Sequence, residues 1–462
     1  MSTLESDLLC EGQVGRLCLR NIKELSDQDV AFLHVYVTTS GHQLTKLEFT
    51  NVQLPLYLLV FIMQGAPNIT HILFNNTKTI QNTEVKKVEC INFTKLEEVS
   101  YTSCDYAIEY LFTVMTENTF VKINAQFSYP ELFQKLIKRQ RELKMLSGSI
   151  AKDLCRVNWK PFNLNHTKLH RLDLFLIIEN PDCIEEILKH QTELQYLNLT
   201  RIPLNYNMVE SISLMINLIE LTINTKMNIP ALVYEGFSNL TNLQSLIIEN
   251  HRKYNFTDNE EHDDISYRHY EEIEVLSNIT TMNLTRLEIT YSESTLHPLC
   301  MLRFAKNNPN LISVRIDAFP GIPFSHFIQH CKKLTMFNVF YAEYVPKNFY
   351  RPYDLVDEKF MNLNLEIFRV NTMFFNFNHL KEFISNFPNL KVLQILLPEP
   401  LTKTQLKSLM IGLTHLTTLY ISYHYLDDFP LQREVFKEFC RKLITKHKYP
   451  LKTMFIQKYS IL

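Results

Sequence analysis

Apolar residues recur along this chain in a short phrase that predicts β-strands. At Leu194–Leu199 the sequence reads L-Q-Y-L-N-L, with apolar residues separated by three and then two positions. Because side chains of a strand alternate between its two faces, Leu197 and Leu199 point together into a core. Asn198 and Thr200 point to the opposite face, where they meet solvent or a ligand. One such strand buries little surface alone, so neighbouring copies must cover it.

The same phrase returns throughout the 462 residues at similar intervals. Most successive copies begin 23 to 31 residues apart, and the two longest intervals are 35 and 41 residues. We expect seventeen strands, opening at Val14, Leu44, Ile69, Leu96, Phe120, Leu143, Leu169, Leu194, Leu218, Leu243, Leu284, Leu311, Leu334, Leu365, Leu390, Leu416 and Leu451.

The segments between the strands have helical spacing. In Pro181–His190 the residues Cys183, Ile184, Ile187 and Leu188 form one apolar stripe, and Pro and Asp stand where a helix begins. The same pattern predicts helices at Leu54–Met63, Asn207–Met215, Pro323–His330, Leu380–Phe387 and Thr402–Leu413. Strands joined by crossover helices become parallel. The sequence therefore predicts an α/β solenoid over residues 1–462, with a concave parallel sheet and helices on the convex side.

Several copies of the phrase resemble the leucine-rich repeat family. They include L-T-K-L-E-F from Leu44, L-H-R-L-D-L from Leu169 and L-T-R-L-E-I from Leu284. The helix-containing intracellular branch of that family, with ribonuclease inhibitor and the F-box/leucine-rich-repeat proteins, looks most similar. The lead-ins C-K-K-L at 331–334, N-P-N-L at 308–311 and F-P-N-L at 387–390 resemble the C-P-x-L phrase of the F-box proteins.

That resemblance implies a protein-recognition scaffold, and for the F-box proteins the substrate-recognition part of a cullin-type ubiquitin ligase. An F-box would dock on the adaptor of such a ligase. Leu54–Ile62 superficially resembles the opening of an F-box, but the strands at Leu44 and Ile69 leave room for only one repeat helix. The ligase role therefore rests on analogy.

Composition narrows the classes of function. A formal net charge of −2 and a pI near 6.8 give no global basic field, which argues against specific nucleic-acid binding and against a membrane surface. The acidic N-terminus lacks the features of a signal peptide, and the nine cysteines are scattered without disulfide caps. We expect a monomer in the cytoplasm or nucleus. A fragment of an extracellular receptor would require a missing signal sequence.

Motifs for catalysis are absent from the sequence. No Gly-rich phosphate loop, nucleophile elbow, H-E-x-x-H or Cys-x-x-Cys occurs, and the whole chain holds only 8 Gly. The acidic segment contains His251, His262, Asp263, Asp264 and His269, but no pair stands at the helical i, i+4 spacing of metal ligands. We expect no enzyme activity, no cofactor and no metal.

Three segments depart from the repeat rhythm. Residues 250–283 are acidic with interleaved aromatics, which fits a solvated loop or a partner-binding lid. Residues 340–364 are dense in Tyr and Phe, which pack on the solenoid or on a partner. Residues 424–462 combine basic and apolar residues, as expected of a terminal cap or of a contact with an anionic surface.

The alternation of strand side chains predicts where a partner binds. Concave positions in the first half are small, polar or acidic, as at Glu48 and Asp173, whereas the second half concentrates Arg and aromatic residues, the types that dominate interface hot spots. The candidate partner-binding residues, within about 284–423, are Arg286, Glu288, Arg315, Asp317, Asn338, Phe340, Arg369, Gln394, Tyr420 and Tyr423. They favour an acidic or aromatic peptide segment, unless they are ordinary solvated strand positions.

Two functions remain open at this level. One is a non-enzymatic recognition scaffold, such as the substrate-binding part of a ubiquitin ligase. The other is a repeat-type regulator that binds and inhibits a globular partner, as ribonuclease inhibitor does.

Overall fold

A computed structural model shows an α/β chain that divides into two compact units, residues 1–218 and 219–462. We describe each unit by itself. The structure describes residues 15–80, 91, 93–114, 121–127, 129–140, 142–150, 168–176, 182–224, 231–250, 280, 283–291, 298–317, 324–340, 361–370, 377–397, 401–423, 438, 442, 445, 450–456 and 459–460.

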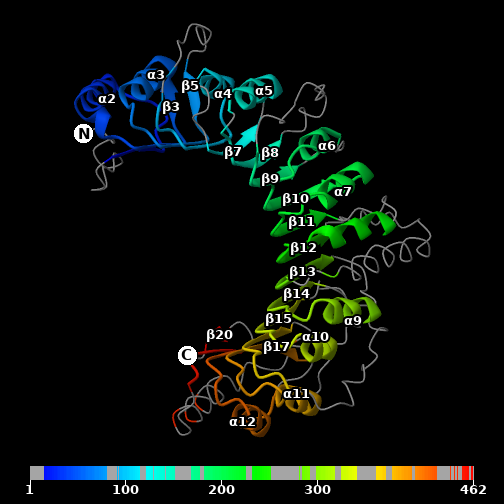
Figure 1. Ribbon diagram of the computed structural model, residues 1–462. Helices are drawn as coiled ribbons and strands as arrows, with labels where there is room; N and C mark the ends of the chain where they lie inside the picture. The colour runs from blue at the N-terminus through cyan, green and yellow to red at the C-terminus, as the bar shows by residue number, and fades with distance from the viewer. Residues whose placement is uncertain are drawn as a thin grey trace, which may run out of the picture. The chain divides into compact units, whose positions relative to one another are not determined.

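The first unit is built on parallel strands that pair in sequence order. These strands are β1 (Arg16–Arg20), β2 (Lys46–Thr50), β4 (His71–Asn75), β6 (Glu98–Thr102), β7 (Lys122–Phe127), β8 (Met145–Ile150), β9 (Arg171–Leu176) and β10 (Tyr196–Pro203). A small parallel pair, β3 (Gln53–Pro55) and β5 (Lys78–Ile80), lies beside them. One face of the sheet is covered by α2 (Asp27–Ser40), the 3-10 turn η1 (Gly41–Gln43), α3 (Leu56–Gly65), α4 (Tyr106–Thr113), α5 (Pro130–Arg139), α6 (Asp182–Leu188) and α7 (Tyr206–Ser213) (Figure 1).

The second unit repeats this plan. Its parallel strands are β11 (Glu220–Asn224), β12 (Ser245–Asn250), β13 (Arg286–Tyr291), β14 (Ser313–Asp317), β15 (Met336–Phe340), β16 (Ile367–Val370), β17 (Val392–Leu397), β18 (Thr418–Tyr423) and β19 (Thr453–Ile456). The short β20 (Tyr459–Ser460) closes the edge antiparallel to β19. The helices are η4 (Ala231–Asn239), a 3-10 helix, with α9 (Pro298–Asn307), α10 (Phe324–His330), α11 (Phe377–Ile384) and α12 (Lys403–Ile411) (Figure 1).

The predicted fold class is confirmed: within each unit the chain is an α/β leucine-rich-repeat solenoid. Among the described residues, every predicted strand is present, and each begins two residues after its predicted opening. The predicted helices are also present, including α3 in place of an F-box opening, with Leu58, Leu59, Ile62 and Met63 buried. The predicted loops at 250–283 and 340–364 lie mostly outside the described residues. Of the predicted cap at 424–462, the structure describes residues 438, 442, 445, 450–456 and 459–460, which include β19 and β20.

The core forms where the second and third apolar residues of each phrase stack on their copies. Leu197 and Leu199 in β10 are 1% and 0% exposed, and Leu287 in β13 is 0% exposed. Aromatic residues take the same places in some strands, as where Phe49 and Phe74 stack with ring centroids 4.9 Å apart. Neighbouring repeats thus cover each other's apolar side, as the phrase requires.

Among the described residues, a second buried position precedes twelve of the strand phrases by three residues, and we call it the lead-in position. At most of these positions the carbonyl accepts a hydrogen bond from the N–H of the phrase's first residue. Leu334 donates to Cys331 at 3.0 Å, and Leu390 donates to Phe387 at 3.2 Å. Buried occupants include Gly41, Ala66, Phe93, Gln140, Gln191, Met215, Leu240, Asn308, Cys331, Asn362, Phe387 and Leu413. The Cys of the C-K-K-L lead-in is therefore one case of a turn that many residues can occupy.

In the first unit, a ladder of asparagines follows the strands. Asn21, Asn51 and Asn76 have φ values of 56°, 54° and 47°, in the left-handed region that Asn tolerates better than most residues. The Asn51 side-chain amide donates to Asn21 Oδ1 at 2.9 Å, and the Asn76 amide donates to Asn51 Oδ1 at 2.9 Å. Ser103 continues the left-handed position after β6 with a φ of 54°. The ladder fixes the same turn at successive repeats.

Candidate functional site

In each unit, the sheet face opposite the helices is not covered by another layer of the described chain, and we call it the open face (Figure 1). Exposure alternates along the strands, so that β17 reads intermediate, buried, intermediate, buried, intermediate, buried. The strand register aligns open-face residues of successive repeats into rows. We call one row of the second unit the middle row: Thr222, Ile247, Glu288, Arg315, Asn338, Arg369, Gln394 and Tyr420.

Six of the ten predicted partner-binding residues are neighbours in the middle row. Arg286 lies two residues before Glu288 in β13 and pairs in register with Ser245 and Ser313. Asp317 and Phe340 pair with each other at the ends of β14 and β15. Tyr423 pairs with the buried Leu397, three positions beyond Tyr420, and so falls on the alternate parity from the middle row. The side chains of Asp317, Phe340 and Tyr423 lie outside the described residues.

Several arginines of the open faces are neutralised within the sheet. Arg286 donates to Glu288 Oε1 from Nη2 at 2.8 Å and from Nε at 3.0 Å. In the first unit, Arg171 Nε donates to Asp173 Oδ2 at 2.5 Å. Because these carboxylates lie two residues along the same strand and on the same face, each pair satisfies its own charge.

Glu48 forms a similar pair at the first strands. Arg16 Nη2 lies 2.6 Å and Arg20 Nη2 lies 3.4 Å from Glu48 Oε2. Burial would raise the pKa of the Glu48 carboxyl, but the hydrogen bonds from both arginines and the charge of Arg16 outweigh it and hold that pKa below its usual range. Glu48 is therefore ionised and engaged with its own neighbours.

Asn338 and Arg369 differ from these pairs. They are register partners on β15 and β16, and Asn338 is 6% exposed. Among the residues that the structure describes, Asn338 Oδ1 and Arg369 Nε are buried without a hydrogen-bond partner. Ser245 Oγ and Ser313 Oγ, beside Arg286 on the same face, share this state. Each buried polar atom without a partner costs roughly 1–3 kcal/mol, so this face retains unused hydrogen-bonding capacity.

An apolar row that sequence reasoning missed runs beside the middle row. Met336, Ile367 and Val392 are register partners on β15, β16 and β17, and each is only partly buried. They open their strands two residues before Asn338, Arg369 and Gln394. The signal was present in the sequence, since the same offset led to Arg286. These three residues form an apolar row next to the row that contains Arg369.

Cys104 and Cys331 are not reactive thiols. Burial raises the pKa of Cys104 and the pKa of Cys331 to about 12 each. Cys331 Sγ points toward the carbonyls of Ala305 and Asn308 at 3.7 and 3.6 Å, inside the lead-in turn. Such thiols are inert at neutral pH.

In the part of the chain that the structure describes, no cluster of three His, Cys, Asp or Glu side chains has the geometry of a metal site. In the same residues, no helix combines the length and apolar character needed to cross a bilayer.

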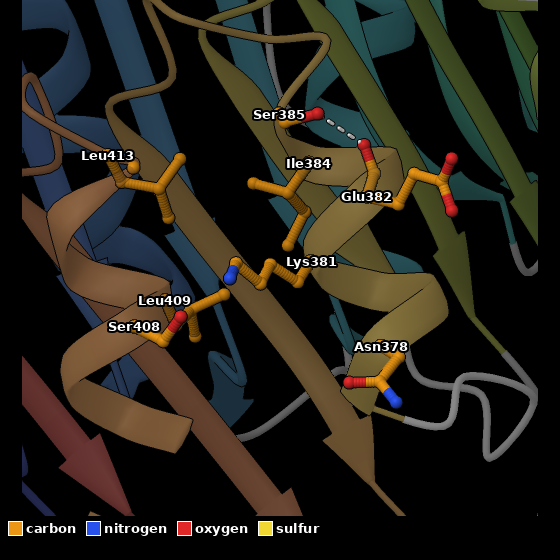
Figure 2. Close-up of a pocket in the computed structure, with 9 residues that line it drawn as sticks. Asn378, Lys381, Glu382, Ile384, Ser385, Ser408, Leu409 and Leu413 are labelled. Atoms are coloured by element: carbon orange, nitrogen blue, oxygen red, sulfur yellow. Dashed lines mark hydrogen bonds between the residues drawn. The ribbon is translucent and has the colours of Figure 1, made fainter. Parts of the chain in front are cut away.

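The helical side contains a groove between α11 and α12, with a volume of about 260 Å³. Figure 2 shows Lys381 and Glu382 of α11, with Ser385 just after this helix, beside Ser408 and Leu409 of α12. The Ser385 hydroxyl donates to the Glu382 carbonyl at 2.6 Å, which leaves it engaged with its own helix. The lining contains no pairing of a nucleophile with a base, so we assign no chemistry to this groove.

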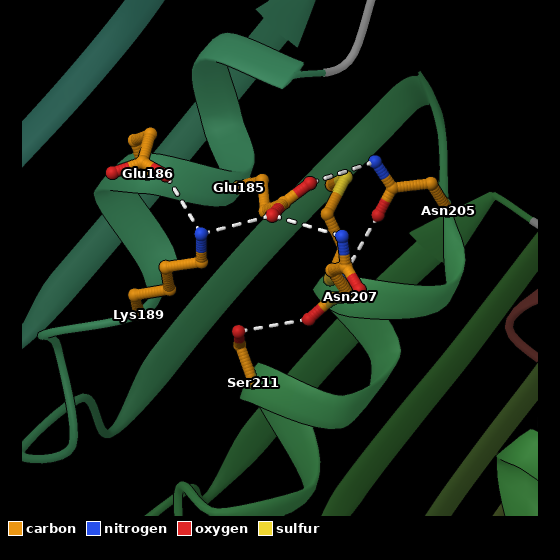
Figure 3. A network of polar contacts seen from close by, with 7 residues as sticks. Glu185, Glu186, Lys189, Asn205, Asn207 and Ser211 are labelled. Carbon is orange, nitrogen blue, oxygen red and sulfur yellow. Dashed lines mark hydrogen bonds and ion pairs between the residues drawn. The ribbon is translucent and has the colours of Figure 1, made fainter. Parts of the chain in front are cut away.

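A polar network on the helical side joins α6 to α7 (Figure 3). Glu185 accepts from Asn207 at 3.0 Å and from Asn205 at 3.3 Å, and it lies 3.0 Å from Lys189 Nζ. Burial would raise the pKa of Glu185, but the hydrogen bonds from Lys189 and Asn207 outweigh it and hold that pKa below its usual range. Asn205 also caps α7 by accepting from the Met208 N–H at 2.8 Å. The network aligns two helices and has a structural role.

Comparison with known proteins gives remote likenesses to solved structures. No protein-family model matches the chain, and no curated protein matches it. A chain of the Rad7–Elc1 complex in yeast is similar at 13% identity over 83% of this chain and 75% of that chain, with a TM-score of 0.36. Internalin InlF from Listeria monocytogenes is 15% identical over 96% and 87%, with a TM-score of 0.31. The functional domain of InlJ from Listeria monocytogenes is 11% identical over 84% and 70%, with a TM-score of 0.31.

Proposed function

We propose that this chain is a non-enzymatic scaffold that binds a protein partner on the open face of its second unit. One observation carries the proposal. Among the residues that the structure describes, Asn338 and Arg369 of the middle row have buried polar atoms without hydrogen-bond partners. The partly exposed apolar row of Met336, Ile367 and Val392 lies next to them. Arginine flanked by apolar side chains is typical of interface hot spots.

The function is proposed in finer detail as substrate recognition for a cullin-type ubiquitin ligase, by a monomer in the cytoplasm or nucleus. The lead-in phrases C-K-K-L, N-P-N-L and F-P-N-L support this reading. Their first residues, Cys331, Asn308 and Phe387, occupy the same buried lead-in position in three different repeats. The open face holds the substrate in this proposal, and the ligase adaptor binds elsewhere on the protein.

Affinity purification with mass spectrometry tests the proposal. The full chain carries a tag and is compared with the double variant Arg315→Glu with Arg369→Glu. The control, Lys332→Glu with Lys407→Glu, makes the same charge change on exposed residues outside the sheet. Circular dichroism and thermal melting establish that all three forms fold alike.

We expect the wild type and the control to recover the same partner, and the middle-row variant to lose it by about tenfold or more. Equal recovery by the middle-row variant would refute the assignment of the open face. Adaptor and cullin subunits among the recovered proteins would support the ligase role. Recovery of a single enzyme without ligase subunits would support the repeat-type regulator instead.

A further inference from the structure

We infer that the open face at β15–β17 recognises an extended peptide segment that carries an acidic side chain two residues from an apolar one. The inference rests on the proposed function and names the chemistry of the partner. The acidic side chain binds Arg369, and the apolar side chain packs on Met336, Ile367 and Val392.

We infer an acidic side chain in the peptide because Arg369 lacks the carboxylate partner that other open-face arginines have among the described residues. Arg16, Arg171 and Arg286 each contact a carboxylate of their own sheet at 2.5 to 2.8 Å. The structure shows no such carboxylate at Arg369 among the described residues, and its Nε is buried without a hydrogen-bond partner. A guanidinium in this position gains a charge-assisted pair when a carboxylate arrives from outside, and the pair forms where water is already partly excluded.

Neighbouring amides extend this recognition. Asn338 and Gln394 are the register partners of Arg369 on its two sides. Successive parallel strands lie about 4.8 Å apart, so both carboxamides are within reach of a group bound at Arg369. Carboxamides donate and accept hydrogen bonds, which suits the second carboxylate oxygen and the backbone of a peptide.

The apolar side chain of the peptide, and its distance of two residues from the acidic one, are inferred from the positions of Ile367 and Arg369 on β16. Ile367 lies two residues before Arg369 on β16 and points to the same face. Residues two apart along a strand are separated by about 6.6 Å, which is also the distance between alternate side chains of an extended peptide. A peptide that runs along the strands can therefore place a carboxylate over Arg369 and an apolar group over Ile367 at the same time.

A carboxylate fits this site better than a phosphate. Phosphate recognition usually combines several cations or a cluster of backbone N–H groups. Here the groups beside Arg369 in its row are neutral carboxamides, and the adjoining row is apolar. A single guanidinium with apolar neighbours is suited to one Asp or Glu side chain within an otherwise apolar segment.

A selection from a random dodecapeptide display library against the immobilised full-length protein tests the inference. The same selection is run on Arg369→Gln, on Ile367→Arg, and on Lys407→Gln as a control outside the sheet. We expect wild type and control to enrich Asp or Glu two positions from Leu, Ile, Met or Phe, in either order. Arg369→Gln should retain the apolar preference and lose the acidic one.

Fluorescence anisotropy with an enriched peptide and its Asp-to-Asn or Glu-to-Gln counterpart gives the magnitude. We expect the counterpart to bind wild type about tenfold more weakly, and the two peptides to bind Arg369→Gln equally. Arg369→Lys should keep part of the acidic preference, because it keeps the charge but not the fork of donors.

The outcomes distinguish a failure of the peptide inference from a failure of the proposed function. Peptides that lose binding in Ile367→Arg but show no acidic preference overturn this inference and leave the proposed function standing. Peptides that bind Ile367→Arg as well as wild type place recognition elsewhere and overturn both. A selection that enriches no sequence overturns the inference that a short extended segment is enough for recognition.

Discussion

Replacing Asn51, in the asparagine ladder of the first unit, should lower folding stability by an amount that can be estimated from the structure. Replacing it by alanine removes two side-chain hydrogen bonds, one to Asn21 and one from Asn76. It also places a Cβ-bearing residue without a polar side chain at a φ of 54°. The left-handed conformation costs roughly 1 kcal/mol, and each exposed hydrogen bond contributes about 0.5–1 kcal/mol. Asn51→Ala should therefore destabilise this region by about 2–3 kcal/mol.

The variant Asn51→Gly separates the cost of the left-handed backbone from the loss of the two hydrogen bonds. Glycine adopts a positive φ without steric cost but makes no ladder hydrogen bond, so it should cost about 1 kcal/mol less than alanine. Asn75→Ala is the matched control, because Asn75 is an exposed asparagine in β4 whose side chain makes no hydrogen bond to a described residue. We expect that variant to change stability by less than about 0.5 kcal/mol.

Native-state hydrogen exchange is the suitable assay, because the two compact units need not unfold together. The opening free energy is read from amides of β2 and β4 in each variant. If Asn51→Gly loses as much opening free energy as Asn51→Ala, the left-handed backbone at this position does not contribute to the loss. If Asn51→Ala behaves like Asn75→Ala, the ladder contributes nothing to stability.

Three further predictions concern the core, the helical layer and the thiols. Leu287→Ala removes a fully buried side chain and should cost about 2–5 kcal/mol, measured by exchange in β12–β14; a cost below 1 kcal/mol would contradict shared burial between repeats. The lowered pKa of Glu185 implies stabilisation that is present above the usual carboxyl range, near pH 4.3, and is lost as pH falls through the lowered value. Glu185→Gln should lower the melting temperature at pH 7 and have no effect at a pH low enough to protonate the wild-type carboxyl. An equal loss at pH 7 and at the low pH would contradict a stabilising role of the ionised carboxylate. Because burial raises the pKa of Cys331 to about 12, iodoacetamide at pH 8 should label it only after unfolding, which peptide mass spectrometry would detect.

Much of the fold follows from apolar spacing. Each strand phrase places two residues on the helix side, as Leu197 and Leu199 in β10, and a shift by one residue would turn both to the open face. The lead-in position was less apparent, because its described occupants range from Gly41 to Phe387 and share only their burial and, at most positions, a backbone hydrogen bond. Composition alone does not reveal such a position.

The candidate site was predicted in part. Alternation along the strands placed Arg315 and Arg369 on one face, and the register makes them part of one row. The sequence did not indicate that Arg286 is neutralised by Glu288, because side-chain pairing depends on rotamers. The Asn51 ladder was also missed, although three asparagines stand seven residues after their strand openings. Whether any of these residues binds a partner stays a prediction.

The uniform register has a consequence for how specificity is encoded. Arg315, Asn338, Arg369, Gln394 and Tyr420 are neighbours in space, yet 23 to 31 positions separate each from the next along the chain. A linear motif search would never gather them. Deleting or duplicating one complete repeat would instead remove or add one residue of this row and leave the remaining turns and strands intact. The residues of this row can thus be changed one whole repeat at a time.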